Sequence, residues 1–259
     1  MDYLLFRLYG PMASWGEIAV GETRHTASYP GKSAIIGLLA AALGIKRGDV
    51  EKQLQMQQGY ALAVEVYSQG SLLRDYHTTQ VPDSVGNFTY RTRRDELVLG
   101  KARLGGAILS SREYRTDALA LIAVRTLPAA PYGLQTIKKH LEKPIFHIYL
   151  GRKSCPLAAP MDPQIIEKKN YFEAFNAYQH KPMMQTDKIS EGTLTGRDAY
   201  WLGRNNVRHY YWEGESSDFS DTIDLSRMQT RTRHDQPLSR TRWQFSPRQE
   251  NYFYFSGGE

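Results

Sequence analysis

The stretch YLLFRLYGPMASWGEIAVGETRHTASYPGKSAIIGLLAAALGI, residues 3–45, decides the fold that the rest of the chain must join. Residues 3–9 alternate apolar and more polar side chains, which is the period of a strand with one buried and one amphipathic face. A polar loop of about twenty residues follows, and a loop of that length in a compact domain is usually functional. Pro30 and Gly31 then open a helix with apolar residues at helical spacing. The apolar positions are Leu4, Phe6 and Leu8 in the strand and Ile35, Leu38, Leu39 and Ala42 in the helix.

The remainder of residues 1–160 predicts more strands, a second helix and a projecting arm. Residues 79–111 are polar, basic and rich in Gly, with too little apolar surface for a core of their own. We therefore expect this segment to project as an inserted hairpin. Without it, the elements follow the βαββαβ order of an α+β ferredoxin-like (RRM-like) fold, which RNA-recognition modules share. The predicted elements are strands at 59–66, 118–124 and 145–150, extended chain at 72–78 and a helix at 131–142.

Residues 161–259 are less periodic, and we expect them to form a β-rich C-terminal extension packed on the core. A helix is predicted at 165–178, short strands at 208–212 and 222–225, and a closing strand at 251–255, where Tyr and Phe alternate. The role of residues 160–226 stays open.

Charge placement indicates nucleic acid as a partner. The net charge is +6, but residues 227–248 alone hold six arginines against one acid. Seventeen tyrosines and four tryptophans supply flat faces that can stack on unpaired bases. There is no run of eighteen apolar residues and no signal-peptide pattern, so we expect no membrane association. A single cysteine, Cys155, fits a reducing compartment, and we expect a cytoplasmic location.

Five blocks of sequence, in order, resemble one family. They are RLYGPMASWG, TRHTASYPGKSAIIGLLAAALGI, LLRDYHT, REYRTDA and KPIFHIYLGRKSCPL. This order is similar to the CasD family of the RAMP superfamily, the subunit of the type I-E CRISPR surveillance complex (Cascade) that holds the 5′ end of the guide RNA. The resemblance covers most of residues 3–160 and returns near residues 233–248.

The resemblance implies a non-catalytic RNA-binding subunit that acts in antiviral defence. Such a subunit caps the 5′ handle of the CRISPR RNA inside a hetero-oligomer. Its implied protein partners are a backbone subunit and the large subunit, and it meets target DNA only through the complex. The arm at 79–111 would be the family's thumb, which reaches over the guide, displaces a nucleotide and contacts the neighbouring backbone subunit. Phe88 or Tyr90 would serve as its wedge.

The start of the first helix raises a question of phosphate binding. Gly31-Lys32-Ser33 resembles the end of a phosphate-binding loop, but the required glycine is absent because residue 26 is Thr26. Nucleotide hydrolysis is therefore rejected, and a milder phosphate contact at the helix N-terminus remains. Gly151 and its basic neighbours form a loop that could approach a phosphate backbone. The full set of predicted RNA-binding residues is Arg24, His25, Lys32, Ser33, His77, Arg91, Arg93, Arg94, Arg112, Gly151, Arg152, Lys153, Arg233 and Arg242.

No catalytic residue, metal site or cofactor is predicted. Lys138, Lys139 and His140 could act in RNA cleavage, but they fall on the polar face of an amphipathic helix, so a solvated face is the better interpretation. The histidines show no metal-ligand spacing. A metal-independent endoribonuclease that processes CRISPR precursor RNA remains the alternative function, and a free-standing RNA-recognition protein is third. Trp15 is expected to be a core residue and Cys155 a buried apolar one.

Overall fold

The computed structural model describes residues 1–83, 86, 89–98, 100–183, 198, 207–239, 242 and 244–256. Its elements, in chain order, are β1 (Asp2–Tyr9), β2 (Trp15–Gly16), β3 (Thr23–Arg24), β4 (Thr26–Ala27), α1 (Lys32–Ala42), α2 (Val50–Gln58), β5 (Tyr60–Ser68), β6 (Ser71–Thr79), α3 (Arg93–Val98), η1 (Lys101–Arg103), β7 (Ile108–Thr116), β8 (Leu119–Thr126), α4 (Leu134–Glu142), β9 (Gln164–Glu167), α5 (Tyr171–Ala177), β10 (Val207–Trp212), α7 (Ser216–Phe219), η2 (Leu225–Arg227), β11 (Gln229–Ser239) and β12 (Gln244–Ser256).

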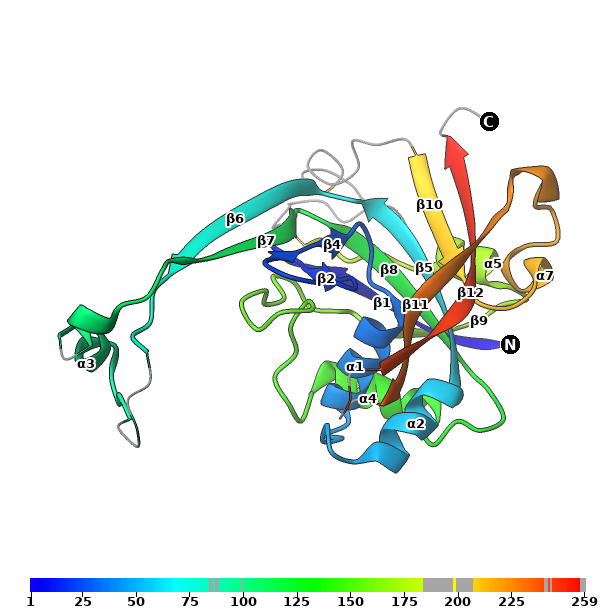
Figure 1. Cartoon of the computed structure of the whole chain (residues 1–259). Coiled ribbons are helices and arrows are strands. Elements are labelled where there is room, and N and C mark those ends of the chain that lie inside the picture. The colour runs from blue at the N-terminus through cyan, green and yellow to red at the C-terminus, as the bar shows by residue number, and fades with distance from the viewer. Residues whose placement is uncertain are drawn as a thin grey trace.

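A seven-stranded antiparallel sheet forms the body, with the strand order β11-β12-β10-β5-β8-β1-β9. Helices α1, α2 and α4 lie on one side of it, and α5 and α7 lie on the other (Figure 1). Four neighbouring strands of this sheet have the spatial order β9-β1-β8-β5. Helices α1 and α2 lie between β1 and β5 in the chain, and α4 lies between β8 and β9. The mixed α+β architecture agrees with the predicted class.

Strand β1 is buried on both faces. Leu4, Phe6 and Leu8 pack in the core beneath α1 and α4, as their alternation predicts. Tyr3 and Leu5 point to the other side and pack against α5. The prediction of one amphipathic face is therefore wrong, because a second helical layer from the later part of the chain covers that face.

The last strand of the predicted βαββαβ unit lies later in the sequence than predicted. Residues 145–150 form a loop with one isolated bridge, from Tyr149 to Pro156, and β9 occupies the expected place beside β1. The backbone N–H groups of Ile145 and Phe146 donate to carbonyls of α1, so they have no sheet partner among the described residues. The predicted helix at 165–178 is likewise β9 followed by the shorter α5.

Asn170 explains where α5 begins, because its side chain accepts a hydrogen bond from the N–H of Glu173 at 2.9 Å. The strand predicted at 222–225 is absent, and a short 3-10 helix begins at Leu225 instead. The strands predicted at 208–212 and 251–255 are confirmed as parts of β10 and β12. Together with β11 they extend the sheet beyond β5.

The arm projects from the body on two long strands (Figure 1). Strands β6 and β7 pair antiparallel without a break from Ser71 opposite Thr116 to Thr79 opposite Ile108. The stem therefore begins before and ends after the predicted segment 79–111, and the tip carries α3 and η1. At the base, β3 adds to β7 in parallel, while β2 pairs with β4.

Two interior predictions are confirmed, since Trp15 and Cys155 are both buried in the core beneath α1. Helix α4 buries Leu134, Ile137 and Leu141, as expected. None of the helices among the described residues is long and apolar enough to span a membrane.

Candidate nucleic-acid interface

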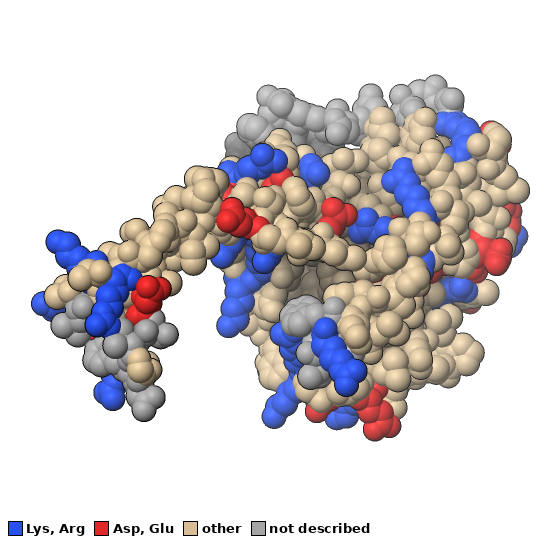
Figure 2. Space-filling model, in the orientation of Figure 1, with Lys and Arg blue, Asp and Glu red and all other residues tan. Residues whose placement is uncertain are grey.

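A cleft of about 1370 Å³ opens between four segments from three separate parts of the sequence. They are the loop between β1 and α1, helix α1, the loop after α4 and the β11–β12 hairpin. Figure 2 shows a hollow at the centre of this face, with Lys and Arg side chains around its margin. Four predicted residues line the cleft, namely Arg24, Ser33, Gly151 and Arg233.

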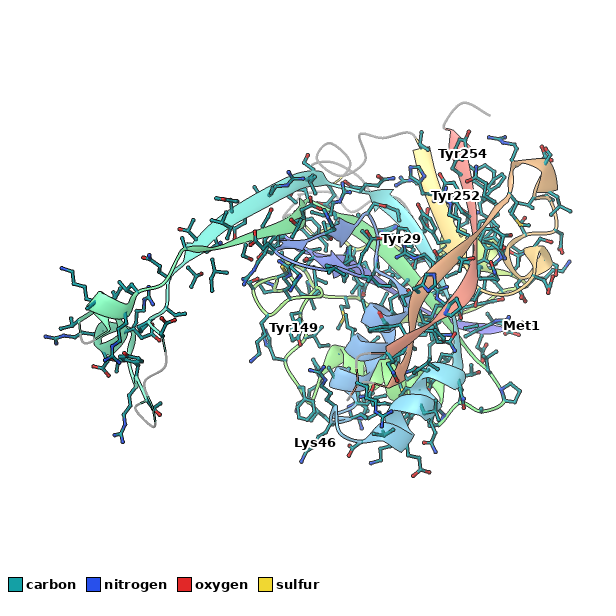
Figure 3. All side chains as sticks on the ribbon, in the orientation of Figure 1. Met1, Tyr29, Lys46, Tyr149, Tyr252 and Tyr254 are labelled. Carbon is teal, nitrogen blue, oxygen red and sulfur yellow. The ribbon has the colours of Figure 1, made fainter. Side chains whose placement is uncertain are left out.

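The floor of the cleft is made of small residues of α1. Ala34, Gly37 and Ala41 line it, together with the mostly buried Leu38, while Ile35, Ile36 and Leu39 are buried in the core. Phe146 and Tyr149 contribute exposed rings from the loop after α4. Tyr149 is labelled in Figure 3. A shallow floor flanked by rings allows a flat group to approach closely and to stack.

The glycine of the 151–153 loop serves the packing of the protein itself. Gly151 has φ +84°, and a Cβ there would collide with the carbonyl oxygen of Ser14. Its neighbour Arg152 lies with its guanidinium carbon 5.0 Å from the ring centre of Tyr114. The Nη1 atom of Arg152 is buried and has no hydrogen-bond partner in the described part of the chain. Lys153 is exposed.

One row of the small sheet collects further predicted residues. Arg24 on β3 is in register with Arg112 on β7, which is in register with Asp75 on β6. Side chains in register share a face, so the two arginines stand side by side. His77 lies two residues beyond Asp75 on that face, and its Nδ1 is 2.8 Å from the Asp75 carboxylate. Charged side chains are thus present on the strands that form the stem of the arm.

The opposite face of the same sheet holds a buried carboxylate. Glu113 accepts a hydrogen bond from Arg74 at 2.8 Å and lies 3.2 Å from Nδ1 of His25. The hydrogen bond from Arg74 holds the pKa of Glu113 below its ordinary value, and His25 and the N–H of Thr26 act in the same direction against burial. His25, one of the predicted RNA-binding residues, is therefore an exposed side chain whose ring is held by the buried carboxylate of Glu113.

The N-terminus of α1, proposed for phosphate, is occupied by a carboxylate of the chain. Asp235 accepts a hydrogen bond from the backbone N–H of Lys32 at 2.8 Å. The ammonium of Lys32 is buried and pairs with Glu213 at 2.8 Å. Both features that favoured a phosphate thus serve contacts within the chain: Asp235 docks the β11–β12 hairpin on the helix, and Glu213, just after β10, holds the inward-turned Lys32.

A buried charge network continues from that point. Arg248 donates to Asp235 at 2.6 Å and to Glu250 at 2.6 Å, and it lies 3.3 Å from Glu213. Burial alone would lower the pKa of Arg248, but these carboxylates raise it. Much of the positive charge of residues 227–248 is therefore balanced inside the protein.

Arg233 stands between this network and the cleft. Its guanidinium lies 3.4 Å from Glu17 and over the ring of Tyr29 at 5.1 Å. Arg242 is exposed at the turn of the same hairpin, while Arg240 lies outside the described residues.

The basic residues of the arm tip lie far from the cleft (Figure 1, Figure 2). Arg91 and Arg94 are exposed, and Arg93 pairs with Glu96 at 2.6 Å. Of the two wedge candidates, Tyr90 is described and partly exposed, and Phe88 lies outside the described residues. The predicted residues thus form a group around the cleft and the base of the arm, and a second group at its tip.

Sequence reasoning missed the residues that hold the interface together. Arg74 and Glu113 stand in the LLRDYHT and REYRTDA blocks, but their pairing depends on the β6–β7 register. Tyr29 gave no signal and Arg248 was counted only as part of a basic segment, because their partners are distant in the chain. Among the described residues no group of His, Cys, Asp and Glu is arranged to hold a metal ion.

Comparisons with known proteins find one family of relatives that matches most of the chain. The family described as CRISPR-associated protein (Cas_Cas5) matches residues 3–250. The CRISPR system Cascade subunit CasD of Escherichia coli (strain K12) is 34% identical over 214 residues, which are 79% of this chain and 88% of that protein.

Two solved structures share the fold. A chain of a CRISPR RNA-guided surveillance complex superposes with a TM-score of 0.59 at 24% identity, and the match covers 98% of this chain and 89% of the other. A crystal structure of a Cas protein gives 0.50 at 23% identity, covering 98% and 92%.

Proposed function

The chain belongs to the Cas5 family of CRISPR-associated proteins, and on that premise we propose that it is a non-catalytic subunit of a type I-E Cascade complex that caps the 5′ handle of the CRISPR RNA. The relative that is 34% identical bears the name of a Cascade subunit, which supports membership of such a complex. The single cysteine is buried in the core, which suits the proposed location in the reducing cytoplasm.

A ferredoxin-like core at 1–160 with a C-terminal extension at 161–259 is part of the proposal. The antiparallel order β9-β1-β8-β5, with helices between β1 and β5 and between β8 and β9, supports it. Since β9 begins at Gln164, the boundary is better drawn after that strand.

The convergence of Arg24, Ser33, Gly151 and Arg233 on one cleft carries the proposal for RNA. Arg112 lies in register beside Arg24 and adds a further cation next to it. The unsatisfied Nη1 of Arg152 is the kind of donor that a phosphate oxygen satisfies. Rings and a small-residue floor accommodate an unpaired base, so the handle is expected to bind as a single strand.

The arm is proposed to contact the adjacent backbone subunit and the guide. Its tip has exposed arginines on and beside α3 and η1, and its stem carries exposed apolar residues such as Leu72 and Ile108. Exposed apolar groups on a projecting hairpin favour a protein partner. The large subunit and, through the complex, target DNA are further proposed partners.

Binding of purified protein to a labelled RNA with the mature 5′ handle tests the proposal. Arg24→Ala and Arg112→Ala are each expected to weaken binding, and removing one cation that pairs with a phosphate should lower the salt dependence by roughly 0.7 in log K per log salt. Lys168→Ala, an exposed change after β9, is the matched control. A salt-independent affinity contradicts the proposal. Cleavage of repeat RNA without metal would favour the endoribonuclease instead.

A further inference from the structure

Three side chains on β10 and β12 form a surface of rings that we call the aromatic platform: His209, Tyr252 and Tyr254. The ring centres of His209 and Tyr252 are 5.9 Å apart with planes 15° apart, and those of Tyr252 and Tyr254 are 6.2 Å apart with planes 25° apart. At these distances and angles the rings tile side by side with similarly oriented faces. Tyr254 is 37% exposed and His209 is half-buried, so the far end of the platform is open to solvent.

Arginines accompany the rings. The guanidinium carbon of Arg231 lies 4.1 Å from the ring centre of Tyr252, and that of Arg227 lies 5.5 Å from the ring centre of Tyr254. Arg231 is exposed and donates to the side chain of Gln229 at 2.9 Å. Within the described ranges no carboxylate forms an ion pair with Arg231, so its charge faces solvent.

Buried tyrosines hold the platform in place. Tyr29 stacks on Tyr211 with ring centres 3.6 Å apart, and Tyr211 lies 5.0 Å from Tyr252. The Tyr29 hydroxyl donates to Glu250 in the charge network, and Nδ1 of His209 is 2.8 Å from the Tyr252 hydroxyl. Tyr252 is only 9% exposed and belongs to the same core cluster as Tyr211, so the more exposed rings of His209 and Tyr254 are anchored to a packed row of tyrosines beside them, which lowers the entropy lost when a flat ligand stacks.

The platform is continuous with the cleft. Arg233 lines the cleft and lies over Tyr29, the first ring of the row. Arg231 is two residues away on the same face of a regularly paired stretch of β11, about 7 Å along the strand. Figure 3 shows Tyr252 and Tyr254 along β12, with Tyr29 nearer the base of the arm. A strand that leaves the cleft at Arg233 meets Arg231 and the platform next.

Rings interleaved with solvent-facing arginine charge are the chemistry of single-stranded nucleic acid recognition, since bases stack on the rings and phosphates pair with the guanidinium groups. We propose that the aromatic platform binds unpaired nucleotides of the strand that occupies the cleft, with Tyr254 and His209 as stacking faces and Arg231 as the phosphate contact. This inference rests on the proposed function, because it takes the strand to arrive from the cleft. None of the residues predicted from the sequence belongs to this site.

The test uses the full-length chain and fluorescein-labelled oligoadenylates of about 4 to 16 nucleotides, a range typical of single-strand-binding sites. RNA and DNA forms of each length identify which strand chemistry is preferred. Tyr254→Leu removes the ring, and Tyr254→Phe keeps it as the matched control. Tyr254→Leu is expected to lower affinity for the longer oligonucleotides about fivefold or more, the effect of losing one stacked base, and to leave the shortest unchanged. Tyr254→Phe is expected to bind as the parent does.

Two further measurements keep the outcome decisive. Arg231→Gln should lower affinity for long oligonucleotides and reduce the salt dependence, even if Tyr254→Leu proves poorly folded by circular dichroism. Photocrosslinking of a thiouridine-containing strand should label the peptide that contains Tyr252 and Tyr254. Equal affinity of folded Tyr254→Leu and Arg231→Gln at every length, or crosslinks confined to the cleft, would overturn the proposal. So would a loss of partner-subunit assembly with RNA binding intact.

The cleft variant Arg24→Ala separates this proposal from the proposed function. If only Arg24→Ala weakens binding, the cleft binds RNA and the platform does not. If only the platform variants weaken binding, the platform holds a strand and the cleft assignment fails.

Discussion

Replacing Arg248 with methionine removes a buried cation and leaves its stem. In the native chain Arg248 lies against Asp235, Glu250 and Glu213, so Arg248→Met leaves three carboxylates without their shared partner. Breaking a buried ion pair by removing one member costs roughly 3–5 kcal/mol in the free energy of unfolding. At about 2–4 °C per kcal/mol for a chain of this size class, the melting temperature should fall by roughly 6–20 °C.

Urea unfolding followed by tryptophan fluorescence measures this loss, with Arg91→Met as the matched control. Arg91 is exposed at the arm tip, so its replacement should change the free energy of unfolding by no more than about 0.5 kcal/mol. Adding Asp235→Asn to Arg248→Met should restore part of the loss, because it neutralises one stranded carboxylate, with a coupling of about 0.5–3 kcal/mol. A loss below about 1 kcal/mol for Arg248→Met would show that the network does not dock the hairpin.

Three further changes test other parts of the structure. Deleting residues 82–106 should leave the thermal transition of the isolated chain nearly unchanged, because α3 buries no residue, yet it should block incorporation of the adjacent backbone subunit; unfolding of the shortened chain would make the tip part of the core. Alanine at Lys138, Lys139 and His140 should leave guide maturation unchanged in cells, since these side chains lie on the outer face of α4, and loss of processed guide with assembly intact would reveal an active site. Burial raises the pKa of Glu65 to about 7, so its contribution to stability falls as pH rises from 4.5 toward 7, and Glu65→Gln should gain stability relative to the parent across that window. Burial lowers the pKa of His180 to about 4, so stability is lost as pH falls from 6.5 toward 4, and denaturant titrations of His180→Gln should show a smaller acid loss than the parent; parallel pH profiles for parent and variants would contradict both assignments.

Periodicity predicted the elements whose packing is local. The alternation in β1 and the spacing in α1 and α4 each reflect a face pressed on the core, so these elements and the residues of that face were predicted correctly, whereas the burial of the second face of β1 was not. The strand predicted at residues 145–150 is wrong, because the conformation of these residues depends on contacts with a distant element. Their apolar residues suit a strand, but the N–H groups at 145 and 146 bond to the end of α1. Only the tertiary position of that helix end decides between the two.

The sequence predicted which residue types the candidate site contains, but it did not predict which charged side chains pair with one another. Arg24 and Gly151 reach the cleft as expected, yet Lys32 turns inward to Glu213, which is distant in the sequence. Charge counting treated residues 227–248 as a basic surface, whereas Arg248 is buried among acids. Sequence patterns report the charge of a segment, and only the fold shows which charges remain for a partner.

The place of β5 in the sheet has a consequence during protein synthesis. Its partner β8 follows soon, but its other edge pairs with β10, and 144 residues separate Ser68 from Trp212. At about 5–20 residues per second, this edge of a largely apolar strand waits roughly 7–30 s for its partner to be translated. An unpaired apolar edge recruits other strands, so nascent chains that stall before β10 should aggregate or require a chaperone.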